Sequence, residues 1–263
     1  MIKITSIEQL NLLINDFKKR GGNLFSNWYP NPPLHESWID KGVLLVNIEN
    51  SILILLHKKE THIEFFFFTY ILDNIKDYAK KLSNYFHKPV VIENVYRNDS
   101  LLKMPLPHVT LKRMVRKGST IDIIKDKPIK FEKIKASHQD IRELQSIFSN
   151  KFNPLTERIP SYQELESLIE AKGVSLIKDN GKITGFIIYE IKGKSCHLRY
   201  WWIDENYRNK GIGSCLIADM FKEAQNTSLQ YLWVFENNED AIQKYNHYGY
   251  SFDGMNDDIY IIN

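Results

Sequence analysis

Residues 198–224 read LRYWWIDENYRNKGIGSCLIADMFKEA, and the rest of the chain is organised around this stretch. Residues 198–203 are apolar and favour β structure, which predicts a buried strand. The glycine-containing turn RNKGIG follows at residues 208–213. A helix is expected next, because apolar side chains recur with the spacing of one helical face. They are Ile212, Leu216, Met220 and Ala224, with Ile217 and Phe221 beside them.

A strand, a glycine turn and a helix N-terminus together predict an anion site. The first backbone N–H groups of a helix have no partner within the helix, and the helix dipole favours negative charge there. Gly211 and Gly213 allow the main chain to approach a phosphate without an intervening Cβ. Turns of this kind serve many phosphates and some serve none, so the turn alone does not define a ligand.

Two motifs resemble those of one family. The pattern Arg208-x-x-Gly211-x-Gly213, after an Ile-Asp-x-x-Tyr strand end, resembles the acyl-CoA pyrophosphate loop of the GNAT superfamily of N-acyltransferases. A second pattern, at the usual distance from the loop, is similar to the family's asparagine–alanine–tyrosine–glycine–aromatic signature. Its residues are Asn238, Ala241, Tyr245, Gly249 and Tyr250.

The expected fold is α/β (α+β) in two domains, residues 1–125 and 126–263. The second follows the GNAT order: strand, two helices, three antiparallel strands, glycine loop and helix, strand, helix and final strands. The resemblance therefore implies a mixed, mostly antiparallel sheet flanked by helices. Helices are predicted to open at the capping boxes of Ser137 and Ser161, and Asn180-Gly181 predicts a type I′ hairpin. Strands are predicted at 130–135, 174–178, 183–191, 195–203 and 231–235.

The first half repeats part of this order. A capping box at Ser6 opens a helix, and a second helix is expected after Asp73. Residues 23–38, NLFSNWYPNPPLHESW, are expected to be irregular, with aromatic side chains that pin a long loop to the core or line a pocket. The run Phe65 to Phe68 fits a strand covered on both faces. Strands are predicted at 42–48, 51–57, 62–69, 89–95 and 105–114.

No glycine lies between Phe68 and Asp73, where the pyrophosphate loop would fall. The first half is therefore interpreted as a degenerate GNAT-like copy without a cofactor site. Residues 116–127 are charged and contain glycine, which predicts a domain junction. Nucleic-acid contact by these basic residues is the alternative interpretation.

Composition narrows the functional class. Hydrophobic residues at 43% and charged residues at 25% are globular values. The net charge of +3 gives no reason to expect nucleic acid or a membrane as partner. Cys196 and Cys215 are expected to be buried thiols in a reducing compartment, and no signal peptide or membrane-spanning run is evident, so the protein is expected to be cytoplasmic. The eight histidines show no metal-ligand spacing, so no metal is expected.

The resemblance implies how acetyl-CoA, or another acyl-CoA, would be held. Backbone groups of Trp201 and Ile203 would pair with the pantetheine amides, as an added strand would. Arg208 and Lys210 would add positive charge, unless they are simply exposed basic residues, and Asn238 would lie near the thioester arm. Backbone amides along the loop would hold the pyrophosphate: Asn209, Lys210, Gly211, Ile212, Gly213 and Ser214.

The resemblance also implies an acid, Tyr245, that would protonate the departing thiolate; the alternative is that Tyr245 only packs its helix. Glu190 and His197 are candidate bases on neighbouring predicted strands, unless they face solvent. Glu205 stands where many family members carry proline, which alters the strand exit but not the loop.

The sequence thus predicts an N-acyltransferase, with acetylation of an amine by direct attack on the thioester. The alternatives are a non-catalytic acyl-CoA-binding or partner-binding module, and acyl transfer onto a macromolecular acceptor with the first half as a docking domain. The sequence does not specify the acceptor or the oligomeric state.

Overall fold

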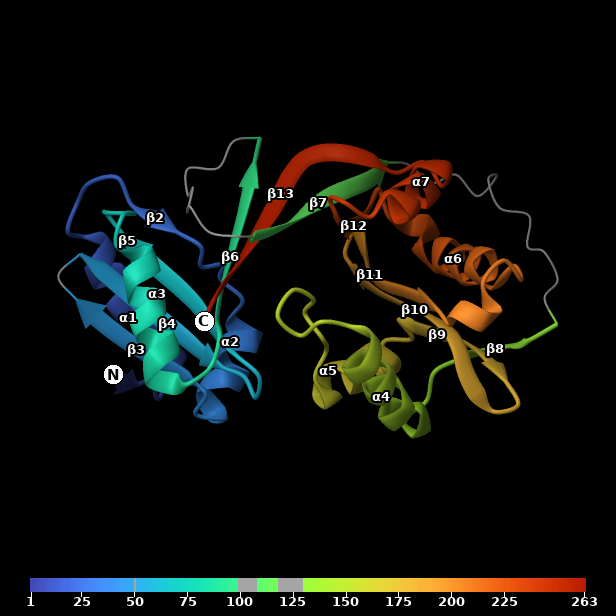
Figure 1. Cartoon of the computed structure of the whole chain (residues 1–263), viewed down its shortest axis with the longest axis horizontal. Coiled ribbons are helices and arrows are strands. Elements are labelled where there is room, and N and C mark those ends of the chain that lie inside the picture. Colours follow the sequence, from blue (N-terminus) through green and yellow to red (C-terminus); the bar gives the residue numbers. More distant parts are fainter. Residues whose placement is uncertain (50, 99–107, 118–129) are drawn as a thin grey trace. The chain divides into compact units, whose positions relative to one another are not determined.

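The computed structural model describes residues 1–49, 51–98, 108–117 and 130–263, which form two compact units (Figure 1). The first unit comprises residues 1–110 and 256–263, and the second comprises residues 111–255. Each unit is a sheet with helices on both faces, which confirms the predicted fold class.

The first unit has the strand order β1-β3-β4-β5-β6, followed by the end of β13. Its elements are β1 (Ile2–Lys3), α1 (Ile7–Lys18), β2 (Phe25–Ser26), α2 (Pro32–Asp40), β3 (Leu44–Glu49), β4 (Ile52–Lys58), β5 (Ile63–Thr69), α3 (Ile75–Phe86) and β6 (Val90–Arg97). Phe65 and Phe67 join the core under α3, whereas Phe66 and Phe68 pack on the side of α1 and α2. The phenylalanine run is therefore covered on both faces, as its apolar sequence predicts.

The prediction that residues 23–38 are irregular is wrong. They contain β2, which pairs with β5, and most of the helix α2. Pro32 and Pro33 stand at the start of α2, where the missing N–H costs nothing and the fixed φ suits a helix. The two prolines therefore begin a helix here.

The second unit has the strand order β7-β12-β11-β10-β9-β8, with β11 and β12 parallel and the other neighbours antiparallel. Its own elements are β8 (Glu132–Lys135), α4 (Ile141–Lys151), α5 (Tyr162–Glu170), β9 (Val174–Asp179), β10 (Lys182–Lys192), β11 (Ser195–Ile203), α6 (Ile212–Glu223), β12 (Leu229–Phe235) and α7 (Glu239–His247). Helices α4 and α5 pack on one face, and α6 and α7 pack on the other. The predicted hairpin is confirmed, because Asn180 and Gly181 have φ of 48° and 78°.

Two strands divide between the units. Residues 111–117 of the strand β7 (His108–Lys117) belong to the second unit, where they pair with β12. The strand β13 (Ser251–Ile262) belongs to the first unit from residue 256 onward, and its residues Tyr260 and Ile262 lie in the core under α3. The predicted boundary at residue 125 lies outside the described residues. Arg116, placed in the predicted junction, is instead a buried residue of β7.

A partly buried polar network fixes α6 on the sheet. Asp219 of α6 accepts hydrogen bonds from Lys135 of β8 at 2.8 Å and from Ser175 of β9 at 2.6 Å. Lys135 also donates to the hydroxyls of Ser175 and Tyr189, each at 2.9 Å. The pKa of Asp219 is lowered by these hydrogen bonds and by the nearby lysines, although burial opposes the shift. The network holds the helix whose N-terminus forms the glycine loop.

We expect Asp219→Ala to lower the free energy of unfolding by about 2 kcal/mol, because the partly buried Lys135 ammonium group and the Ser175 hydroxyl lose a charged acceptor. The measurement is chemical denaturation at neutral pH. Asp219→Asn retains an oxygen acceptor and should lose less. Equal stability of Asp219→Ala and the native chain would show that the network does not hold α6.

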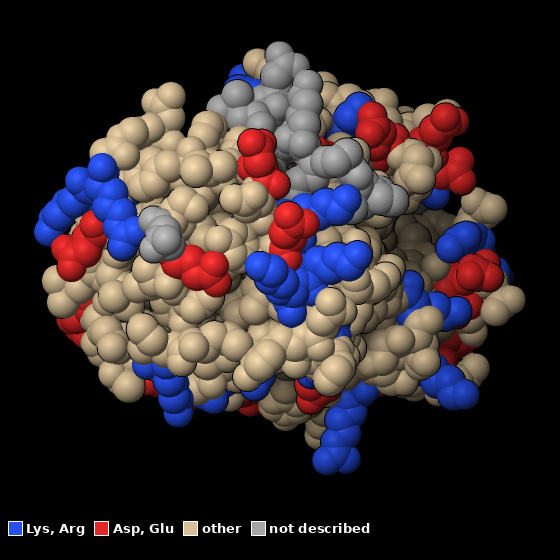
Figure 2. Space-filling model, turned by 60° about the vertical axis from the view of Figure 1, so that its left-hand side comes forward, with Lys and Arg blue, Asp and Glu red and all other residues tan. Residues whose placement is uncertain are grey.

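Basic and acidic side chains are interspersed on the face of the molecule shown in Figure 2. No helix in the described part of the chain is both long and apolar enough to span a membrane.

Candidate functional site

The glycine loop enters α6 with left-handed backbone at two positions. Asn209 has φ of 62°, and Gly211, the N-cap of α6, has φ of 81°. A glycine N-cap has no side chain to accept from the first helical N–H groups. The first turn of α6 contains no acidic residue, and Arg208 and Lys210 are exposed beside it. This helix end therefore suits an anion.

Close packing explains the glycine at position 213. A Cβ there would lie 3.0 Å from Cδ1 of Ile203 and 3.1 Å from Cζ2 of Trp201. Gly185 of β10 is a second position of this kind, since its Cβ would lie 2.9 Å from Cγ2 of Ile212. The two glycines bring α6 close to the ends of β10 and β11. Sequence analysis missed Gly185, which lies within a strand pattern and outside any motif.

The strands β11 and β12 pair over only part of their length. Parallel pairing runs from Ser195↔Leu229 to Leu198↔Leu232. Beyond Leu198, β11 continues to Ile203 paired with β10 on its other side. On the side that faces β12, the backbone of Trp201 and Ile203 is therefore not paired with that strand, and we call this unpaired stretch between β11 and β12 the strand gap. The indole Nε1 of Trp201 is buried without a hydrogen-bond partner among the described residues.

Helix α7 brings Tyr245 to the same region. Its ring lies 5.9 Å from the ring of Trp201 and 6.0 Å from that of Tyr250. Burial raises the pKa of Tyr245 to about 12, so the phenol stays protonated at neutral pH. Asn238 caps α7 by accepting from the Ala241 N–H at 3.2 Å. Its observed role is thus to begin the helix that carries Tyr245.

The two candidate bases are cross-strand neighbours. Glu190 of β10 lies opposite His197 of β11, and a carboxylate oxygen of Glu190 is 2.9 Å from Nζ of Lys192. The imidazole of His197 stacks on Tyr231 with ring centres 4.4 Å apart. Burial, reinforced by nearby cations that include Arg199, lowers the pKa of His197 to about 3. His197 is therefore neutral at neutral pH and a weak base.

Strand alternation places acid and base candidates on different faces of the sheet. Cys196 and Leu198 belong to the core under α6 and α7, against which Tyr245 packs, so His197 between them faces the side of α4 and α5. Glu190 faces the same side, because its neighbour Tyr189 belongs to the α6 core.

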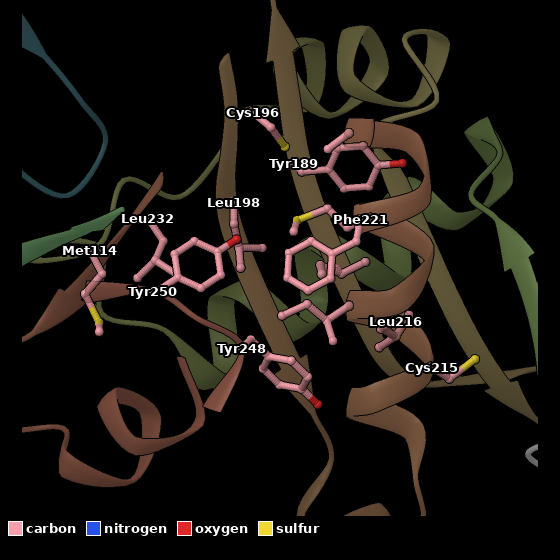
Figure 3. Close-up of a cluster of buried hydrophobic side chains, with 14 of the residues drawn as sticks. Met114, Tyr189, Cys196, Leu198, Cys215, Leu216, Phe221, Leu232, Tyr248 and Tyr250 are labelled. Atoms are coloured by element: carbon pink, nitrogen blue, oxygen red, sulfur yellow. The ribbon is translucent and has the colours of Figure 1, made fainter. Parts of the chain in front are cut away.

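Two further residues support this site and carry no sequence motif. The hydroxyl of Tyr248 lies 3.2 Å from Oγ of Ser214, which ties the end of α7 to the first turn of α6. Arg116 donates to Oε1 of Gln230 at 3.1 Å, and its guanidinium lies 4.5 Å from the ring centre of Phe221. Burial lowers the pKa of Arg116. Figure 3 shows the surrounding core side chains, among them Phe221 and Tyr248.

Both cysteines are buried, as expected, and burial raises the pKa of Cys196 to about 12. Such a thiol is a poor nucleophile at neutral pH. In the described part of the chain, no three His, Cys, Asp or Glu side chains are grouped so that they could hold a metal ion.

Comparison with known proteins identifies the class of the second unit. Residues 139–250 match the model of the acetyltransferase (GNAT) family. Two curated relatives from Bacillus subtilis (strain 168) match over 85 residues: the uncharacterized protein YdhI, 32% identical, and the spermine/spermidine N(1)-acetyltransferase, 31% identical. These matches cover 32% and 28% of this chain, and 52% and 56% of the relatives, so the chain spans about half the length of each.

Similarity extends over the whole chain at the level of fold. A tandem GNAT protein from the clavulanic acid biosynthesis pathway superimposes with a TM-score of 0.60 at 9% identity. The match covers 99% of this chain and 97% of the other. Residues 139–250 thus match the GNAT acetyltransferase family model, and the chain as a whole has the fold of a tandem GNAT protein, as the element order of its two halves predicts.

Proposed function

We propose that this protein transfers an acyl group, acetyl in the first instance, from coenzyme A to an amine. The observation that carries the proposal is one region of the second unit. There the uncapped N-terminus of α6 follows Gly211, the backbone of Trp201 and Ile203 borders the strand gap, and Tyr245 packs beside it. The loop would hold the pyrophosphate of acyl-CoA, and the strand backbone would pair with its pantetheine arm.

In the proposed reaction the amine nitrogen attacks the thioester carbonyl carbon, a C–N bond forms and the C–S bond breaks. The amine gives up one proton, and the departing sulfur takes one from Tyr245. The raised pKa of Tyr245 keeps that proton in place at neutral pH. Glu190 or His197 would accept the amine proton directly or through water, from the opposite face of the sheet. Burial makes His197 a weak base, because it lowers the pKa of the imidazole to about 3.

Tyr245→Phe tests the acid. The variant keeps the ring that packs against Trp201 and loses only the hydroxyl. We expect near-normal acetyl-CoA affinity and a loss of about 10²-fold in kcat, the usual size of a proton-transfer contribution. Binding is measured by calorimetry, and turnover is measured by release of free thiol.

Tyr248→Phe is the matched control, because it removes a hydroxyl from the same helix end whose partner is Ser214. It should change kcat by much less. If Tyr245→Phe retains full turnover, Tyr245 is a packing residue and water supplies the proton to sulfur.

The acceptor is to be found by screening amines for acetyl-CoA-dependent thiol release. Spermine and spermidine are the first to test, because one curated relative is a spermine/spermidine N(1)-acetyltransferase. Acetyl-CoA binding without turnover on any amine would favour a non-catalytic module instead.

A further inference from the structure

The first unit contains the same strand–helix–strand arrangement as the second. Strands β5 and β6 are parallel and joined through α3, as β11 and β12 are joined through α6. Parallel pairing between β5 and β6 is limited to Ile63↔Val90 and Glu64↔Val91. Beyond these positions the facing backbone groups of the two strands need other partners, because buried main-chain groups are costly to leave unpaired.

Asn27 supplies those partners. Its side chain is only 3% exposed. Nδ2 donates to the carbonyl oxygens of Phe65 on β5 and Glu93 on β6, each at 3.0 Å, and Oδ1 accepts from the Phe67 N–H at 2.8 Å. One carboxamide thus bridges both strands where their own pairing has ended.

The residues on either side of Asn27 also contact β5 and β6 where these two strands are not paired with each other. On one side, Phe25 and Ser26 form β2, which pairs with β5 at Thr69 and Phe68. On the other, the hydroxyl of Tyr29 donates to the Val95 carbonyl of β6 at 3.0 Å. Residues 25–29 therefore contact both β5 and β6 where these two strands are not paired with each other; we call them the internal strap.

The helix end beside this gap differs in charge from that of α6. Asp73 precedes α3 and Asp77 lies in its first turn, whereas Arg208 and Lys210 precede α6 and its first turn has no acid. With Lys76 between them, Asp73 and Asp77 leave one net negative charge at the start of α3, where a phosphate would need positive potential, whereas Arg208 and Lys210 bring two positive charges to α6. The start of α3 therefore disfavours a phosphate ligand. The unpaired stretch between β5 and β6 is already occupied by residues 25–29 of the same chain.

We propose that the internal strap occupies, in the first unit, the position that the pantetheine arm of acyl-CoA takes in the second. The Asn27 carboxamide offers an N–H donor and a carbonyl acceptor, the same groups as a pantetheine amide. The first unit is thereby closed to coenzyme A by its own chain. The comparison with the second unit rests on the proposed function, whereas the role of the strap in the first unit does not.

Asn27→Ala in the full chain is the test of the strap. The change removes the side-chain hydrogen bonds to three backbone groups, two of them on the buried residues Phe65 and Phe67, and we expect Tm to fall by about 5–10 °C. Amide hydrogen exchange at Phe67 should accelerate at least about tenfold. Asn47→Ala is the matched control in the same unit, because the Asn47 amide donates an exposed hydrogen bond to the Glu49 carboxylate at 3.1 Å. The Tm of this control should stay within about 1 °C of the native value.

An Asn27→Ala chain as stable as the control overturns the proposal. If the variant does not accumulate, amide hydrogen exchange of the native chain tests the strap instead. The Phe67 amide should then be among the slowest to exchange in the first unit, and rapid exchange there overturns the proposed role of Asn27.

A separate experiment tests whether the first unit is closed to coenzyme A: the Gly211→Asp variant is titrated with coenzyme A in a calorimeter. No heat of binding is expected, and a surviving site in the first unit overturns closure. Failure of the native chain to bind coenzyme A would reject the proposed function while leaving the Asn27 result valid.

Discussion

Gly211→Asp is expected to abolish the thermal stabilisation that acetyl-CoA gives the native protein. At a ligand concentration of 100 Kd the native chain should gain about 2.7 kcal/mol, or about 5–10 °C in Tm. The substitution places a carboxylate at the N-cap of α6, where it would accept from the helical N–H groups and repel the pyrophosphate. Differential scanning fluorimetry with and without acetyl-CoA measures the effect.

The matched control is Gly193→Asp. Gly193 also has positive φ, 56° against 81° for Gly211, and a Cβ there would meet nothing within 4 Å. The control thus carries a similar backbone strain in the β10–β11 turn and should keep the full acetyl-CoA shift. Gly213→Asp should behave as Gly211→Asp does, because even its Cβ would press on Trp201 and Ile203. An unchanged shift in both loop variants would place the coenzyme elsewhere.

Residues 126–263 expressed alone are expected not to fold stably. This fragment lacks residues 111–117 of β7, which pair with β12 along its whole length. It also loses Met114, which is fully buried in the α6 core, and the buried Arg116. Removing an inner strand exposes β12 as an apolar edge, and the loss exceeds the few kcal/mol by which a domain is stable. Circular dichroism and soluble yield measure the outcome.

Co-expression of residues 1–117 with residues 130–263 is the matched experiment. Together the two pieces carry β7 and β13, so each unit has its complete set of strands. We expect a soluble complex that binds acetyl-CoA. A fragment 126–263 that is as stable as the full chain would show that β7 contributes little to the second unit, and full activity of that fragment would make the first unit a separate module.

Local chemistry allowed much of the second unit to be predicted. The capping box at Ser161, the Asn180-Gly181 turn and the buried stripe of α6 depend on residues within about four positions of one another, so the sequence records them directly. The glycine loop was predictable for the same reason, since a strand end, a left-handed turn and a helix N-terminus are consecutive.

By itself, then, the sequence determined the order of elements in the second unit, the glycine loop and the candidates Tyr245, Glu190 and His197. Only the tertiary structure decided that Arg116 lies in the core of the second unit, that Tyr260 completes the core of the first, and that Asn27 fills a strand gap. Asn27 and Phe67 are 40 residues apart, and Arg116 and Gln230 are 114 apart. No local pattern of propensity or spacing specifies such pairs, because strand partners are chosen by packing and by the need of buried backbone groups for hydrogen bonds.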